Sequence, residues 1–322
     1  MKIKILFHNN CFDGVASAAL FAAFYRESVN KDAEQAFEGL AHKAGQIFDE
    51  AVFNGDENAI VDFKYSSSPR LTWWFDHHQS AFLSQEDEIH FRESSQGWKC
   101  GKKFHDPAYR SCTKFIAEIA KSRFGFNTEH MSELIEWADI IDGALYPDAK
   151  TAVELNAPAL RIMLVIESAR DEQLISKIIR DLQSLSLAEV ASQSYITDIL
   201  DRYYNRHLQA IDVIRNAARY DGQVIYFDVS GHDMEGYSKF IPYYLYPDAL
   251  YSVGVSLSPQ RAKVSVGFNP WGKGERRHNL ASICERYGGG GHAVVGAISF
   301  KPEELDQARS VATAIANELH NT

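Results

Sequence analysis

The stretch that decides the fold is residues 2–25, KIKILFHNNCFDGVASAALFAAFY. Residues 2–8 form an apolar run of the kind found in a central strand of a parallel sheet, and residues 14–25 are apolar almost all round a helix. Between them stand His8 and Asp13, at a turn where a histidine and a carboxylate have no evident structural use. The pattern therefore predicts a strand-turn-helix unit of an α/β fold with polar side chains at the turn.

Two further strands are predicted, over residues 59–63 and 71–78, and both carry acidic residues or histidines toward their ends. In open α/β sheets, ligands bind outside the carboxyl ends of the strands. We therefore expect the polar side chains at the strand ends to gather at one edge of the sheet. These side chains are those of His8, Asp62, Asp76, His77 and His78.

The spacing of apolar residues divides the rest of the chain. It is helical from about residue 105 to 219, and strand-like alternation returns with QVIYFDVS, YSVGVSLS and AKVSVGFNP. We expect an N-terminal parallel-sheet domain over residues 1–190, a helical connector over 191–221 and a smaller C-terminal α/β domain with a mixed sheet over 222–322.

Composition limits the classes of function. The 322-residue chain has a net charge of −10 and a pI near 5.6, which argues against a protein that coats duplex nucleic acid through a broad basic face. Its cysteines form no CxxC pair, so we expect a reducing, cytoplasmic setting without a structural zinc site. No apolar run is long enough for a signal peptide core or a membrane span. The cysteines are Cys11, Cys100, Cys112 and Cys284.

Carboxylates and imidazoles dominate the candidate ligands, and this donor set suits hard to borderline divalent ions such as Mn²⁺ or Mg²⁺. Two such ions roughly 3.5 to 4 Å apart can activate a water for in-line attack on phosphorus and neutralise the leaving oxygen. We expect two ions, with Mn²⁺ favoured and Mg²⁺ as the alternative. The candidate ligands are His8, Asp13, Asp62, Asp76, His77, His78, Asp139 and Asp142.

The sequence resembles the DHH phosphoesterases with their DHH-associated C-terminal domain. The resemblance covers most of the chain and rests on five motifs in order: HNNCFDG from residue 8, VDF from 61, DHH from 76, ADIID from 138 and GGGGH from 288. It implies that the N-terminal domain is catalytic and the C-terminal domain binds substrate. It further implies that His8, Asp13 and His77 bind metal, that Asp62 bridges two ions, that His78 contacts the scissile phosphate and that Asp76 orients the histidines.

Two positions leave alternatives open. Asp139 matches one version of the family's fourth motif and Asp142 matches another, so either is a candidate ligand. At Cys11 the family usually has an aspartate, and the replacement substitutes a soft sulfur for a hard oxygen. Three alternatives follow. The site holds two ions with a water in place of the missing aspartate, or it binds one ion tightly and the other weakly, or Cys11 is itself a ligand.

The glycine run near the C-terminus is the candidate for substrate binding. Four glycines stand between a predicted helix and strand, where missing side chains let backbone amides approach an anion or a base. The resemblance implies a recognition loop with His292 near the phosphate, and neighbouring basic residues could form a local clamp. The candidates are Gly288, Gly289, Gly290, Gly291, His292, Arg261, Lys273, Arg276 and Arg277, with Trp271 as a candidate for base stacking.

The sequence therefore predicts a divalent-metal-dependent phosphoesterase that hydrolyses phosphodiester or phosphomonoester bonds by metal-activated water. The expected substrate is a short single-stranded oligonucleotide or a small nucleotide, with no duplex coating and no membrane partner; the sequence gives no oligomeric state. One alternative is a hydrolase of polyphosphate or pyrophosphate. Another is a catalytically weakened relative that only binds nucleotide or nucleic acid.

Overall fold

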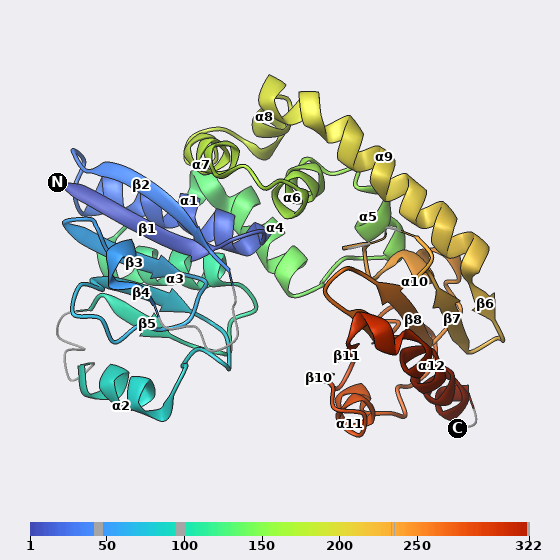
Figure 1. The fold of residues 1–322 in the computed structure, drawn as a ribbon. Coiled ribbons are helices and arrows are strands. Elements are labelled where there is room, and N and C mark those ends of the chain that lie inside the picture. Colours follow the sequence, from blue (N-terminus) through green and yellow to red (C-terminus); the bar gives the residue numbers. More distant parts are fainter. Residues whose placement is uncertain (42–47, 95–100, 233, 235, 321–322) are drawn as a thin grey trace. The chain divides into compact units, whose positions relative to one another are not determined.

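The structure is a computed structural model that describes residues 1–41, 48–94, 101–232, 234 and 236–320. The chain forms two compact units (Figure 1). The first unit comprises Met1–Tyr146 and Asn156–Asp201, and the second comprises Pro147–Leu155 and Arg202–Thr322. Helix α9 (Ser194–Ala217) contains the last of these boundaries, within the stretch 191–221 that the sequence predicts as a connector. No helix in the described part of the chain has the length and hydrophobicity to cross a membrane.

The first unit is built on a five-stranded parallel sheet of order β2-β1-β3-β4-β5, which confirms the predicted parallel sheet. Strand β2 lies on one side of β1, and β3, β4 and β5 follow in order on the other side. The direction of winding therefore changes between β1 and β3. In open α/β sheets, ligands bind outside the carboxyl ends of the strands where the direction of winding changes in this way. The strands are β1 (Lys2–His8), β2 (Glu34–Leu40), β3 (Glu57–Val61), β4 (Trp73–Asp76) and β5 (Lys103–His105).

Helix α1 (Phe12–Ser28) packs against β1 and β3 and also contacts α3 (Cys112–Phe124) and α4 (Ser132–Asp142). Its residues 12–25 are all buried, as its nearly uniform apolar sequence predicts. Helix-forming alanines make up much of this segment, and their small side chains let neighbouring helices approach closely. The helix therefore holds the turn after β1 against both the sheet and the start of α3.

Two adjacent tryptophans show how the sheet is buried on both faces. Trp73 packs against Phe21 of α1, with ring centroids 5.7 Å apart, while Trp74 points to the other face and packs against Tyr65 at 4.8 Å. Both indoles are at most 1% exposed and belong to the core. Because successive side chains alternate between faces, two neighbouring aromatics anchor β4 from both sides.

Shorter helices complete the first unit. They are α2 (Gln85–Ser94), α6 (Pro158–Ser168), α7 (Glu172–Asp181) and α8 (Leu187–Ala191), with 3₁₀ turns η1 (Glu50–Val52) and η3 (Glu129–Met131).

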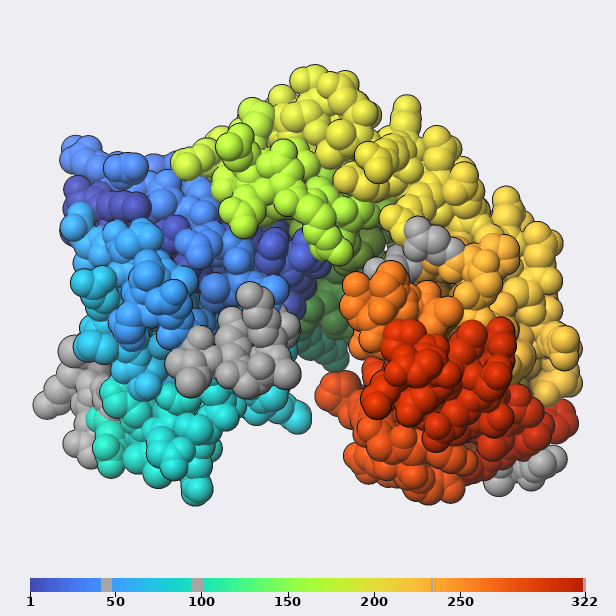
Figure 2. All heavy atoms as spheres, in the orientation of Figure 1, coloured from blue at the N-terminus to red at the C-terminus, as the bar shows by residue number. Residues whose placement is uncertain are grey.

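The second unit is a six-stranded mixed sheet of order β10-β11-β9-β8-β7-β6, as the sequence predicts. Strands β7 and β8 are parallel, and the other neighbouring pairs are antiparallel. Helix α12 (Leu305–His320) packs on β7, β8 and β9, and its outer face lies at the surface of this unit (Figure 2). The strands are β6 (Arg219–Tyr220), β7 (Val224–Asp228), β8 (Tyr251–Leu257), β9 (Ala262–Phe268), β10 (Gly290–His292) and β11 (Val295–Phe300). The other elements are α10 (Ile241–Leu245), α11 (Leu280–Glu285) and η4 (Pro302–Glu304).

Helix α5 (Ala149–Glu154) belongs to the second unit although its neighbours in the sequence belong to the first. The imidazole Nε2 of His207 lies 2.7 Å from the carbonyl oxygen of Val153, and the Tyr244 hydroxyl donates to the Glu154 carboxylate at 3.2 Å. Val153 is fully buried. This short helix is therefore an integral part of the second unit.

Candidate metal centre

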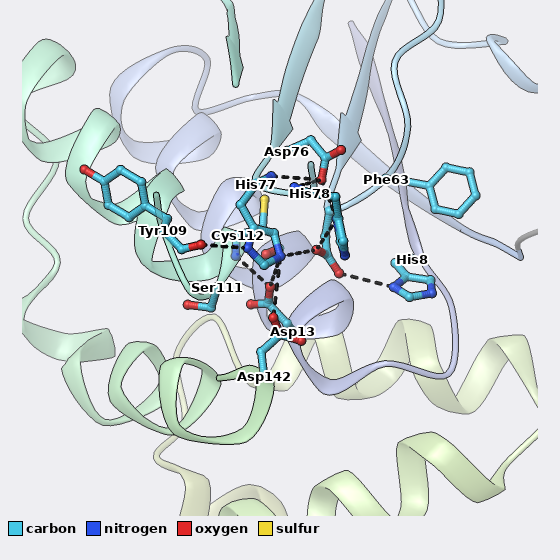
Figure 3. A network of polar contacts seen from close by, with 12 residues as sticks. His8, Asp13, Phe63, Asp76, His77, His78, Tyr109, Ser111, Cys112 and Asp142 are labelled. Carbon is cyan, nitrogen blue, oxygen red and sulfur yellow. Dashed lines mark hydrogen bonds and ion pairs between the residues drawn. The ribbon is translucent and has the colours of Figure 1, made fainter. Parts of the chain in front are cut away.

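Three adjacent strands of the first sheet end in polar side chains. Strand β1 ends at His8, β3 is followed directly by Asp62, and β4 ends at Asp76 and is followed by His77 and His78. Because the strands are parallel neighbours, their carboxyl ends lie side by side, and Figure 3 shows the labelled histidines and carboxylates pointing toward one another. The expected gathering of these residues at one sheet edge is what the structure shows.

The side chain of His77 lies at the middle of the group. Its Nε2 is 3.4 Å from Asp62 Oδ1, 3.5 Å from Asp142 Oδ2 and 3.7 Å from Asp13 Oδ2, while His8 Nδ1 is 3.4 Å from Asp62 Oδ2. Two ligands held about 2.1 Å from one tetrahedral ion are themselves about 3.4 Å apart. The observed spacings therefore match those of atoms that share a cation. These five residues are called the strand-end cluster below.

Asp62 is the most constrained member of the strand-end cluster. Its side chain is only 2% exposed, and among the described residues neither carboxylate oxygen accepts a hydrogen bond. Its backbone is left-handed, with φ of 56°, which is uncommon outside glycine and turns Asp62 away from the line of β3. A buried carboxylate without hydrogen bonds is costly unless a cation partners it.

The electrostatics of the cluster are those of a site that attracts positive charge. Burial opposes ionisation of Asp62, but the imidazoles of His77 and His8 outweigh it and lower the pKa of Asp62 to about 2. Burial likewise disfavours the charged form of His77, yet Asp62 and Asp13 raise its pKa to about 10. Burial and the charge of Asp62 raise the pKa of Asp142 to about 6. Without a metal, a proton on His77 therefore balances part of the negative charge.

The start of helix α3 holds Asp13 in place, a feature that the sequence did not reveal. The Cys112 amide donates to Asp13 Oδ2 at 2.6 Å, and the amide and hydroxyl of Thr113 both donate to Oδ1, at 3.0 and 2.6 Å. Helix N-termini carry free amides and partial positive charge, which suits a carboxylate. The only sequence signal is Ser111 before a helical pattern, a cap that does not reveal its distant partner.

A neighbouring carbonyl fixes the orientation of His77. Its Nδ1 lies 3.1 Å from the carbonyl oxygen of Tyr109, so a proton on Nδ1 leaves Nε2 directed at the carboxylates. Metal-binding histidines commonly use their second nitrogen in this way.

Asp76 and His78 form a second hydrogen-bonded pair at the end of β4. The fully buried Asp76 Oδ1 accepts from the amide of His77 at 2.9 Å and lies 2.7 Å from His78 Nδ1. Hydrogen bonding to Asp76 raises the pKa of His78 despite opposing burial. The His78 side chain is 38% exposed, which leaves its other nitrogen accessible.

Asp139 and Asp142 occupy different environments although both lie on α4. Asp139 forms an ion pair with Lys114 Nζ at 3.0 Å and accepts a hydrogen bond from Ser111 at 3.3 Å, whereas Asp142 faces His77. Asp142 is therefore the residue of this pair that the structure brings into the strand-end cluster.

Cys11 stands at the N-cap of α1 and is partly exposed. Its Sγ, a nitrogen of His8 and an oxygen of Asp62 all lie within 4.8 Å of one another. Burial of the sulfur and the nearby charges of Asp62 and Asp13 raise the pKa of the Cys11 thiol.

The described residues contain three sets of side chains that could hold a cation. They are His8 with Cys11 and Asp62, Asp62 with His77 and His78, and Asp13 with His77 and Asp142. Asp62 belongs to two of these sets, and so does His77, which makes them the links between neighbouring cation positions.

The glycine run of the second unit, residues 288–292, is called the glycine loop below. A Cβ added at Gly289 would lie 2.3 Å from the carbonyl oxygen of Ala297, and one added at Gly291 would lie 2.2 Å from that of Val295. Gly288 has a φ of 77°, while Gly290 has open space around it. Close packing of β10 on β11 therefore explains two of the four glycines.

The basic residues predicted to accompany the glycine loop lie beyond opposite ends of strand β9. Arg276 donates to the carbonyl oxygen of Ala293, directly after the exposed His292, and Lys273 and Arg277 lie exposed in the same loop region. Arg261 directly precedes β9, whose first residue, Ala262, pairs with Phe300 at the end of β11. The start of β11, next to the glycine loop, pairs with the other end of β9. Five residues of strand correspond to roughly 17 Å, so Arg261 lies away from the loop.

Trp271, the candidate for base stacking, packs against Phe240 with ring centroids 5.4 Å apart and is partly buried. One of the remaining cysteines, Cys100, lies outside the described residues.

No protein-family model and no curated protein matches the sequence. Solved structures do match. The pGpG-specific phosphodiesterase PggH from Vibrio cholerae is similar at a TM-score of 0.70 and 16% identity over 99% of this chain and 100% of that one. The DHH domain of a protein described as a member of the s1p family of ribosomal proteins matches at a TM-score of 0.60 and 12% identity. This match covers 99% of this chain and 87% of that one. RecJ from Thermus thermophilus in complex with Mn²⁺ matches at a TM-score of 0.53 and 11% identity. This match covers 98% of this chain and 52% of that one. The protein therefore has the fold of the DHH-domain proteins, as its sequence motifs predicted.

Proposed function

We propose that the protein is a divalent-metal-dependent phosphoesterase that hydrolyses phosphodiester or phosphomonoester bonds of short oligonucleotides or small nucleotides. The observation that carries the proposal is the position of Asp62. Its Oδ2 faces His8 and its Oδ1 faces His77, both at 3.4 Å, and both oxygens are buried. A carboxylate placed in this way fits a bridge between two cations.

The donor set and the buried oxygens of Asp62 fit two divalent ions, with Mn²⁺ favoured and Mg²⁺ as the alternative. His8 and Asp62 would hold one, and Asp13, Asp62, His77 and Asp142 would hold the other. The chemistry that such ions would supply, when bound, is activation of a water for attack on phosphorus and neutralisation of charge on the phosphate oxygens.

The protein's own residues would supply orientation and proton control. His78, held by Asp76 at 2.7 Å, presents its accessible nitrogen to a non-bridging or leaving phosphate oxygen, and its raised pKa favours the protonated, hydrogen-bond-donating form. The amides of Cys112 and Thr113 keep Asp13 in one orientation, and the Tyr109 carbonyl does the same for His77. No side chain need become covalently attached to the substrate.

Support for a nucleotide substrate comes from two directions. PggH is named for the dinucleotide pGpG, and RecJ is described as an exonuclease. In the second unit, the glycine loop offers backbone close to exposed His292 and Arg276, a combination that suits a terminal phosphate. The sequence has no CxxC pair, and this cysteine spacing supports a reducing compartment and a cytoplasmic location.

The test is turnover by the full chain after metal removal and reloading with Mn²⁺ or Mg²⁺. The panel comprises a 5′-phosphorylated linear dinucleotide, a cyclic dinucleotide, a short single-stranded oligonucleotide, 3′-phosphoadenosine 5′-phosphate and polyphosphate. We expect hydrolysis of at least one nucleotide substrate and its loss in Asp62→Asn. Cleavage of polyphosphate alone would replace the nucleotide proposal with the polyphosphatase alternative, and binding without any turnover would leave a nucleotide-binding protein.

A further inference from the structure

We propose that the two cation positions of the first unit differ in their preferred metal. The position lined by His8, Cys11 and Asp62 binds a thiophilic divalent ion, Zn²⁺ or Fe²⁺, with Cys11 as a thiolate ligand. The position lined by Asp13, His77 and Asp142 binds Mn²⁺ or Mg²⁺. This inference rests on the proposed two-ion centre and refines it, because it replaces Mn²⁺ by a thiophilic ion at one of the two positions.

The first step of the argument is the placement of the sulfur. Cys11 Sγ is within 4.8 Å of both a His8 nitrogen and an Asp62 oxygen, so a small movement of side chains brings all three into the bonding range of one ion. The Cys11 thiol makes no capping hydrogen bond at the start of α1, although it occupies the N-cap position. The nearby Gly14 amide favours the thiolate form of this sulfur, against burial and the neighbouring carboxylates.

An independent observation points to a ligand at this place. Asp62 is more than nine-tenths buried, and its Oδ2 is directed at the His8 side of the cluster without accepting a hydrogen bond from any described residue. A cation at the position beside Cys11 would therefore meet a buried carboxylate oxygen whose neighbour on that side is the His8 imidazole, at 3.4 Å.

The chemical difference follows from the donor atoms. Thiolate sulfur is a soft ligand that favours Zn²⁺ and similar ions, whereas carboxylate oxygens favour Mg²⁺ and Mn²⁺. The His8, Cys11 and Asp62 set offers one nitrogen, one sulfur and one oxygen, a mixture found in zinc and iron sites. The Asp13, His77 and Asp142 set offers two oxygens and one nitrogen and no sulfur.

The other described cysteines do not share these properties. Cys112 is fully buried and its thiol is directed at the carbonyl oxygen of Phe75 at 3.4 Å. Cys284 is also fully buried and lies in the hydrophobic core of the second unit. Cys11 differs from both because it is partly exposed and its sulfur lies within 4.8 Å of a His8 nitrogen and an Asp62 oxygen.

The test uses Co²⁺ as the metal, because a thiolate bound to Co²⁺ gives a charge-transfer absorption in the near ultraviolet that oxygen and nitrogen ligands do not give. We expect wild-type protein to develop this band in proportion to one Co²⁺ per chain. The band should be absent in Cys11→Ser and Cys11→Asp and unchanged in the matched control Cys284→Ser. Cys11→Asp should also lower the affinity for Cd²⁺ relative to Mn²⁺ by about tenfold or more.

The outcomes separate this inference from the proposed function. A wild-type protein that binds Co²⁺ without the band, or that keeps the band in Cys11→Asp, overturns the thiolate position even if the enzyme hydrolyses nucleotides. A band without any phosphoesterase turnover supports the thiolate position and removes the proposed function. Because the wild-type spectrum alone decides the first point, misfolding of a variant cannot hide the answer. Protection of Cys11 from iodoacetamide by Zn²⁺, located by peptide mass spectrometry, gives a second measurement on wild-type protein.

Discussion

At the sheet edge of the first unit the central polar side chains are buried, whereas the histidine of the glycine loop in the second unit is exposed. Asp62 and His77 are at most 8% exposed and face one another, while His292 lies in solvent. Buried groups of this kind keep fixed positions because neighbouring strands and helices hold them. The comparison teaches that the sheet edge holds its side chains in fixed positions. The glycine loop instead contributes backbone groups and charged side chains that can change conformation.

The largest effect is expected from Asp62→Asn, which keeps the size and tolerates the left-handed backbone at this position. We expect turnover to fall by on the order of 10³-fold, because both cation positions lose the shared charged ligand. Addition of Mn²⁺ should no longer raise the melting temperature, since a ligand stabilises only a fold that binds it. Differential scanning fluorimetry with and without Mn²⁺ measures this directly.

The matched control for this prediction is Asp139→Asn on α4, whose carboxylate pairs with Lys114 on the surface side. It should change turnover by less than about threefold and leave the Mn²⁺-induced stabilisation intact, because Asp139 pairs with the partly exposed Lys114 and not with His77. A large loss in Asp139→Asn with a small one in Asp142→Asn would reverse the assignment of the two aspartates.

The second largest effect is expected from Thr113→Val, which removes the hydroxyl that donates to Asp13 Oδ1 at 2.6 Å but keeps the shape of the side chain. We expect Mn²⁺ affinity to fall by about 10- to 100-fold, because groups that orient a ligand are nearly as important as the ligand. Isothermal titration calorimetry measures the affinity. Ser122→Ala on the same helix is the control, since its exposed hydroxyl donates to the carbonyl oxygen of Glu118. Equal losses in both variants would contradict the role given to Thr113.

A smaller effect, visible mainly in the pH profile, is expected from Asp76→Asn. Because Asp76 raises the pKa of His78, the protonated imidazole persists to higher pH in the wild type. Removal of that charge should move the alkaline loss of kcat/KM to lower pH while turnover at low pH changes much less. A profile of kcat/KM against pH measures the shift, and an unchanged alkaline limb would mean that protonated His78 is not required.

The smallest effect on the metal centre is expected from the glycine loop. Gly289→Ala places a methyl group against the carbonyl of Ala297 and should destabilise the second unit by about 1 to 3 kcal/mol, while Gly290→Ala, in open space, should cost less than about 0.5 kcal/mol. Neither should alter Mn²⁺ affinity. Urea unfolding followed by tryptophan fluorescence compares the two, and equal destabilisation would show that close packing does not explain Gly289.

Periodicity predicted the first strand correctly because residues 2–8 are buried on both faces and leave an unambiguous apolar run. It missed β2, whose residues are mostly half-exposed, and β5, which has only three residues. It also extended the strand before Asp62 by two residues, since β3 ends at Val61 and Asp62 turns into the left-handed region. Exposure, shortness and backbone strain therefore account for these differences.

His8, Asp62 and His77 could be chosen from the sequence because parallel strands place their ends together. Asp13 and Asp142 lie on helices, and only the resemblance to the DHH motifs indicated them, with Asp139 as the alternative to Asp142. The support from Tyr109 and Thr113 could not be predicted, because backbone carbonyls and amides leave no mark in the residue pattern and their partners are far away in the sequence. Arg261 illustrates the opposite error: it is close to β9 in sequence, but the register of β9 with β11 sets it at the end remote from His292.

The division of the chain has a practical consequence for dissection of the protein. Because α5 belongs to the second unit but lies between two segments of the first, neither unit is one continuous stretch of sequence. Truncation after residue 201 would leave buried Val153 without its partners, and expression from residue 202 onward would omit α5 entirely. Separate preparation of the halves calls for a circularly permuted chain or for complementation with a peptide spanning residues 147–155.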